Sequence, residues 1–251
     1  MAKKTDRSSI LQDIKNLSKL LDKYKFKDHR RIELDKLEKL IDTLEKNLKS
    51  KNKKKVVIST TEDGIGFHTL TNGLAPNPAT VKSKLDIFLN MEYELLVDGA
   101  NIDELVTKYK LNLNIKGVQK NTRNLHFFGW HLDLQPIKNE KNKKETRYHF
   151  IHPYFHFHAG GRSIADKGPG SLMMLNSPRL PHPPLDIVLA INFVLCNFFN
   201  VDESAFSEEM KILDDQDYRN LVESAAERLF EPYFKEISGN IKNNKLVPLF
   251  T

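Results

Sequence analysis

Two segments near the N-terminus carry apolar residues at helical spacing, in alternating steps of three and four. The segment 26–30 between them breaks this rhythm, and Asp28 is placed to cap the second helix. Residues 1–50 are therefore predicted to form an αα-hairpin. Each stripe covers only about two heptads, so the hairpin either packs on its own chain or pairs with a partner protein or a second copy. The stripes are Ile10, Ile14, Leu17, Leu21 and Tyr24, then Leu34, Leu37, Ile41, Leu44 and Leu48.

The chain then mixes strand-like and helix-like patterns. Residues 56–61 are rich in β-branched side chains, which favour a strand, and turn residues follow them. Residues 80–97 carry apolar side chains at helical intervals behind two prolines, and a second, shorter helix is expected after Asn101. Residues 103–124 also fit a helix-turn-helix, although Gly117 would weaken its second helix by about 1 kcal/mol.

Further along, the pattern changes to the alternation of apolar and polar residues that is typical of strands. Residues 125–135 and 147–158 are predicted to pair as an antiparallel hairpin around a charged loop, and this histidine-rich hairpin covers 126–161. Helices are expected over 184–237, starting with a buried apolar helix whose first turn holds two prolines and breaking at Pro232.

The sequence thus predicts an α+β fold with an N-terminal helical hairpin, a central antiparallel sheet that carries the histidine-rich hairpin, and C-terminal helices. We expect a helical hairpin of residues 1–50 followed by an α+β core domain of residues 56–251. The single cysteine, Cys196, falls within the longest apolar run and is expected to be a core side chain.

Charge and composition limit the possible partners and the cellular location of the protein. The 251 residues carry a net charge of +6 and a pI of about 9.1. Lysines gather in 46–55 and 138–147. Such runs usually form solvated linkers, and a nucleic acid or another polyanion as a partner is the alternative. The N-terminus lacks the apolar run of a secretory signal, and no apolar segment reaches the about 20 residues that span a bilayer. A cytoplasmic protein without a membrane anchor is therefore predicted.

Histidines concentrate in the predicted hairpin, where five of the nine fall within 28 residues. Alternation places His131 and Asp133 on one face of the first strand, and His156 and His158 on one face of the second. Pairing of the strands would bring these side chains together, and imidazole with carboxylate suits zinc, manganese or iron. A half-exposed structural cluster is the alternative.

Three further candidates follow the second strand. Arg162, Arg179 and His182 lie in or at the end of a loop rich in glycine, proline and serine. They are candidates for a catalytic, anion-binding role, because arginine commonly binds anionic substrate groups. The glycines of this loop fit neither a phosphate-binding P-loop nor the dinucleotide-binding pattern.

Four segments of the sequence resemble a family of uncharacterised bacterial proteins with Trp-His-x-Asp, His-Pro-x-Phe-His-x-His-x-Gly-Gly and Pro-Arg-x-x-x-Pro-Pro motifs. These segments are 129–133, 152–161, 178–184 and 231–234. The resemblance covers roughly the C-terminal half and implies a bacterial origin and a mobile-element or antiviral defence setting, but no reaction. The second segment is also similar to the histidine-triad motif. Tyr154 stands where that motif needs a third histidine, which disfavours nucleotidyl-hydrolase chemistry.

Two hypotheses for function follow from these patterns. In the first, the protein is a metal-dependent phosphodiesterase or nuclease, in which His131, Asp133, His156 and His158 hold the metal that activates water. A metal-free version would use two of the histidines as general acid and base. In the second, the protein is a non-catalytic nucleic-acid-binding or adaptor subunit of a larger bacterial complex, and its helical hairpin binds the partner.

Overall fold

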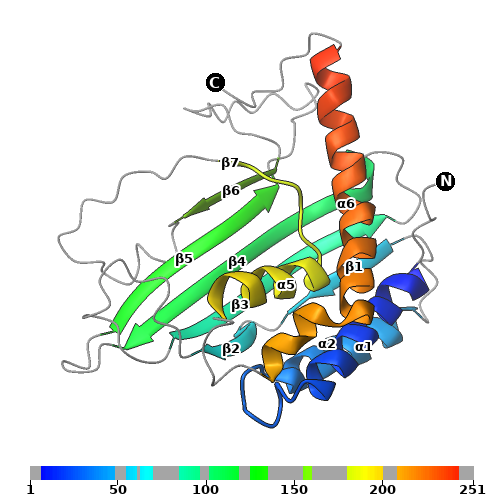
Figure 1. Ribbon diagram of the computed structural model, residues 1–251. Helices are drawn as coiled ribbons and strands as arrows, with labels where there is room; N and C mark the ends of the chain where they lie inside the picture. The colour runs from blue at the N-terminus through cyan, green and yellow to red at the C-terminus, as the bar shows by residue number, and fades with distance from the viewer. Residues whose placement is uncertain are drawn as a thin grey trace.

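The computed structural model describes residues 7–48, 55–60, 63–69, 85–96, 102–118, 125–134, 155–159, 180–199 and 208–242. Helices cover one face of an antiparallel sheet (Figure 1), which confirms the predicted α+β class. The helices are α1 (Arg7–Lys23), α2 (Leu34–Leu48), α3 (Ile102–Leu105), α5 (Ile187–Phe198), the 3-10 helix η2 (Glu209–Asp214) and α6 (Gln216–Lys242). The strands are β1 (Lys55–Ser59), β2 (Ile65–Thr69), β3 (Leu85–Leu96), β4 (Val106–Val118), β5 (Leu125–Leu134), β6 (Phe155–Ala159) and β7 (Leu180–Pro181).

The seven strands form one sheet in the order β1, β3, β4, β5, β6 and β7, and β2 pairs with β3 alongside β1. Side chains of each strand alternate between the two faces, so every second residue of β3 and β4 points toward the helices. Those residues are apolar and nearly all buried, and they form the floor of the core. The helix-facing residues of the two strands include Ile87, Leu89, Met91, Tyr93, Leu95, Tyr109, Leu111 and Leu113.

Two expectations for this central region are wrong. The helix expected over 80–97 is contradicted, because 85–96 form β3, and the helix-turn-helix over 103–124 is contradicted, because 106–118 form β4. Only the single turn α3 remains of the helix expected after Asn101. These segments form strands because a strand buries every second side chain beneath the helix layer. The apolar residues are thereby removed from water, and the polar residues lie on the other face.

The αα-hairpin at the N-terminus is confirmed. Most residues of its stripes up to Leu44 are buried in the same hydrophobic core as the sheet, with Leu17 and Leu37 fully enclosed, and Tyr24 and Ile41 are partly buried against that core. The first helix ends where Lys25 adopts a left-handed φ of 60°, which lets Phe26 turn inward against Phe199 with ring centroids 6.0 Å apart. Asp28 is not the cap of the second helix, because the tight turn continues past it and α2 begins only at Leu34.

The buried helix α5 starts later than expected. Both prolines precede it, and Asp186 caps it by accepting a hydrogen bond from the Leu189 amide at 3.0 Å. The Tyr109 hydroxyl of β4 holds the chain before the helix, donating to the Leu185 carbonyl and accepting from the Leu185 amide, each at 2.9 Å. Arg228 of α6 then binds Asp186 at 2.9 Å and Asp13 at 3.0 Å, so that a buried ionic network joins three helices.

Two details of the C-terminal helices differ from expectation. Cys196 is exposed, because only one side of α5 meets the core and this residue falls on the other side. Pro232 does not break the helix, since α6 continues through it. A proline removes one backbone hydrogen bond, and the buried neighbours Leu229 and Tyr233 anchor the helix on either side of that position. In the described part of the chain, no helix is both long and apolar enough to cross a bilayer.

Candidate metal centre

The hairpin of β5 and β6 has the register that brings the predicted ligands together. His131 lies opposite His158, and Asp133 lies opposite His156. The apolar face fixes this register, because Leu132 is fully buried and Trp130 stacks on Phe157 with ring centroids 5.0 Å apart. A slip of one residue would turn these side chains away from the helices, so packing on one face sets the positions of the histidines on the other.

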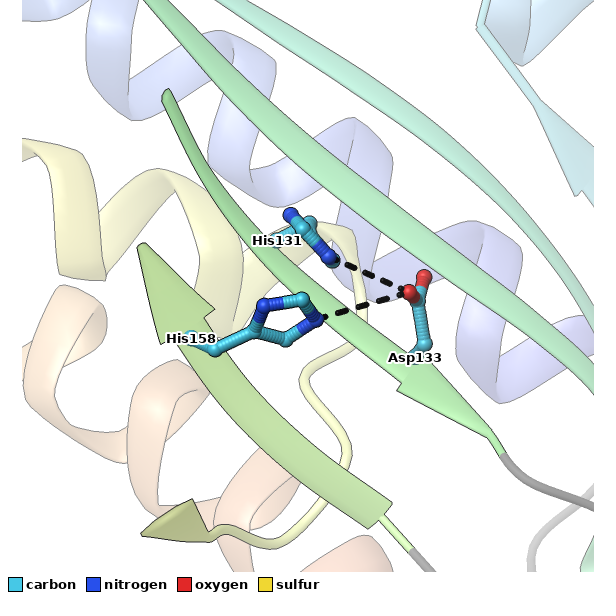
Figure 2. Close-up of side chains that lie close together, drawn as sticks. All are labelled: His131, Asp133 and His158. Atoms are coloured by element: carbon cyan, nitrogen blue, oxygen red, sulfur yellow. Dashed lines mark ion pairs between the residues drawn. The ribbon is translucent and has the colours of Figure 1, made fainter. Parts of the chain in front are cut away.

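Three of the four predicted ligands converge on one point. Figure 2 shows both histidines directed toward Asp133: the Oδ2 atom of Asp133 is 3.5 Å from Nε2 of His131 and 4.0 Å from Nε2 of His158. One ligand atom from each residue lies within 4.8 Å of the others. Metal bonds of about 2.0–2.1 Å in a tetrahedral site place ligand atoms about 3.3 Å apart, so contraction by roughly 1 Å would complete such a site.

The electrostatics of the cluster favour a cation. The side chains of His131 and His158 are only 13% and 14% exposed, whereas that of Asp133 is 36% exposed. Burial raises the pKa of the Asp133 carboxyl, while the charges of His131 and Lys110 act in the opposite direction. The net result is a carboxylate that is held at a cost, and a bound metal ion would relieve that cost.

His156 lies beside this three-residue cluster and not within it. Its side chain is buried, and its ring stacks on that of His158 with centroids 5.1 Å apart and an interplanar angle of 20°. The stacked ring of His156 limits the rotation of the His158 ring.

The other predicted site residues do not join the cluster in the described structure. Arg162 and Arg179 lie outside the described residues, as does the lysine-rich segment 138–147. His182 packs against Phe157 with ring centroids 5.6 Å apart, on the helix-covered face of the sheet and opposite the cluster. Its Nδ1 atom donates to the Pro183 carbonyl at 2.6 Å, and burial lowers the pKa of its imidazole.

Sequence reasoning missed two neighbours of the cluster on β4. The register pairs Lys110 with Asp133 and Asn112 with His131, on the same face of the sheet. The signal that could have found them is the alternation of 106–118, in which polar residues occupy every second position between apolar ones.

A scan of the chain against family models finds no match, and searches of curated proteins and of solved structures also find none. The resemblance of the C-terminal half to a bacterial family therefore stays a prediction. Function has to be inferred from the cluster itself.

Proposed function

We propose that His131, Asp133 and His158 bind a divalent metal and that the protein is a metal-dependent hydrolase of phosphoesters. One observation carries the proposal: imidazole nitrogens from two paired strands face the same carboxylate oxygen, at 3.5 and 4.0 Å. Two imidazoles and one carboxylate are a donor set that zinc, manganese and iron accept.

Among the residues that the structure describes, three donors come together, and this number favours a catalytic role over a structural one. Structural zinc sites are closed by four protein ligands, whereas catalytic sites use three and leave a position for water or substrate. A metal held here would lower the pKa of a bound water and supply hydroxide at neutral pH. The rings of His131 and His158, which are 13% and 14% exposed, form the more closed side of the site, and the more exposed carboxylate of Asp133 leaves the other side open to solvent.

Thermal melts test metal binding directly. Wild-type protein is melted near neutral pH with chelator, zinc, manganese or magnesium. A metal present at about 100 times its Kd stabilises the fold by ~2.7 kcal/mol, which for a domain of this size raises Tm by roughly 5–10 °C. Asp133→Asn removes one ligand with little change in shape and should abolish the shift. The matched control, Asp42→Asn on the exposed side of α2, should keep it.

The same melts at mildly acidic pH sharpen the test. Protons compete with metal for imidazole, whose pKa in free histidine is about 6.5, so the shift should shrink as pH falls below that value. Hydrolysis of a chromogenic aryl phosphodiester and of single- and double-stranded nucleic acids, with and without the stabilising metal, then tests the reaction. Identical melting curves in chelator and in every metal would remove the metal site from consideration.

The adaptor hypothesis draws less support. In the described part of the chain, most of the apolar residues of the α1 and α2 stripes are buried against the rest of the protein, and this leaves little of either stripe for a partner. Deleting residues 1–50 would also strip part of the core, so a deletion could not separate lost binding from lost folding. The bacterial defence setting rests on the sequence resemblance alone.

A further inference from the structure

We propose that Lys110 binds a negatively charged oxygen of the substrate beside the metal centre, and that the substrate is therefore a phosphoester that presents an anionic phosphoryl oxygen toward β4. This inference rests on the proposed function, because it concerns the same site. It gives the anion-binding role to a residue that the structure places next to the cluster.

The placement of Lys110 follows from the sheet. It pairs with Asp133 in the register of β4 and β5, and such cross-strand partners have Cβ atoms about 5 Å apart. Its neighbours Tyr109 and Leu111 point into the core, so Lys110 projects from the face that carries the cluster. Its flexible four-carbon stem then lets the ammonium reach over the carboxylate.

The open side of the cluster and Lys110 face the same solvent. His131 and His158 are 13% and 14% exposed, whereas the side chain of Asp133 is 36% exposed and Lys110 is exposed. A substrate group that reaches the metal must approach from this side. It would meet the Lys110 ammonium on one flank of the carboxylate and the amide of Asn112, the cross-strand partner of His131, beside it.

Lys110 also differs from two other lysines of this face, Lys108 and Lys55. Lys108 binds Glu92 at 2.5 Å and Lys55 binds Glu94 at 2.6 Å, so both charges are neutralised by neighbours. Within the described part of the chain, Lys110 makes no ion pair closer than 4 Å. A divalent metal, one carboxylate and this ammonium together carry a net positive charge, which attracts an anionic group and not a neutral ester.

The closing experiment compares two lysines on one strand. Inorganic phosphate is titrated by calorimetry into protein saturated with the metal that gave the largest melt shift. Lys110→Met should lower phosphate affinity about 10- to 100-fold, because a charge-assisted contact is lost. Lys108→Met removes a lysine charge two residues away on the same strand and should change the phosphate affinity less than about twofold. Lys110→Arg keeps the charge and should retain most of the affinity. With the aryl phosphodiester, Lys110→Met should raise KM more than it lowers kcat.

The outcomes separate the two proposals. Equal phosphate affinity in Lys110→Met and Lys108→Met, with the metal-induced melt shift intact in both, would overturn the role of Lys110 and leave the metal site standing. Absence of any melt shift in the wild type would overturn the metal site and this inference with it. Because Lys110 is exposed, melts in chelator should show both variants folded, and Lys110→Gln provides a second variant if the methionine disturbs the sheet.

Discussion

The two faces of the central sheet obey different rules. On the face beneath the helices, side chains such as Leu89, Leu111 and Leu113 are apolar and at most 1% exposed. The free energy gained by removing apolar surface from water explains their burial. On the other face, the side chains of His131 and His158 are 13% and 14% exposed although they are polar. Burying polar groups costs free energy unless they gain partners. The first face explains why the chain folds. On the second face, the two histidines lie beside the Asp133 carboxylate, and the proposed metal site rests on this arrangement.

Alanine substitutions at adjacent positions of β4 test this contrast most strongly. Leu113→Ala should cost about 2–5 kcal/mol of unfolding free energy, because it leaves a cavity in the core. Asn112→Ala, one residue away on the other face, should stay within about 0.5 kcal/mol. Urea denaturation of both variants measures the difference. A similar loss of unfolding free energy in the two variants would contradict the inference that the helix-covered face, and not the other face, stabilises the fold.

Two aspartates extend the comparison to charges. Asp186 is 2% exposed and binds Arg228, so Asp186→Asn should destabilise the protein by about 3 kcal/mol, the lower end for a broken buried pair, since Asp13 still accompanies the arginine. Asp133→Asn should leave stability unchanged or raise it when measured in chelator, because the amide carries no charge to bury. A loss in Asp133→Asn similar to that in Asp186→Asn would mean that Asp133 serves the fold.

The pH dependence of stability sharpens the case for Asp133. Its carboxyl has a raised pKa in the folded protein, so the folded state holds the proton more tightly than the unfolded chain does. The stability that this carboxyl contributes to the folded state is therefore fully present below the unfolded pKa of about 3.9. It is lost as pH rises through the raised pKa of the folded protein. In chelator, the free energy of unfolding of the wild type should drop below that of Asp133→Asn over that pH interval and stay below it at neutral pH. Saturating metal should reverse the order at neutral pH, because it binds the carboxylate.

Much of the fold could be predicted from the sequence. The main error of that prediction, a helix in place of β3, has a simple cause. In β3 the apolar residues Leu85, Leu89 and Tyr93 stand four positions apart, which also suits a helix. They stand four apart because every second residue is apolar, and only the full alternation over 85–96 and 106–118 separates strand from helix. In the helical hairpin, steps of three and four alternate along the whole of each stripe, and no alternation of period two competes with them.

The site was predictable to the extent that a strand assigns side chains to faces. Alternation placed His131, Asp133, His156 and His158 on the correct faces, since parity depends on backbone geometry alone. Which of them converge could not be predicted, because His156 stacks on His158 through side-chain rotation that the sequence does not encode locally. Lys110 was hidden because its strand had been assigned to a helix.

The smallest expected effect concerns α5, which has a covered and an uncovered side of its own. Cys196 lies in the longest apolar run of the chain but is exposed, so Cys196→Ser should change the unfolding free energy by no more than about 0.5 kcal/mol. Val194 on the same helix is fully buried, and Val194→Thr places a similar hydroxyl in the core, where an unsatisfied polar group costs about 1–3 kcal/mol. Urea denaturation of the pair compares the two sides of one helix at nearly constant side-chain volume. Equal destabilisation would mean that Cys196 is a core side chain, because only burial could make a hydroxyl at that position as costly as one at position 194.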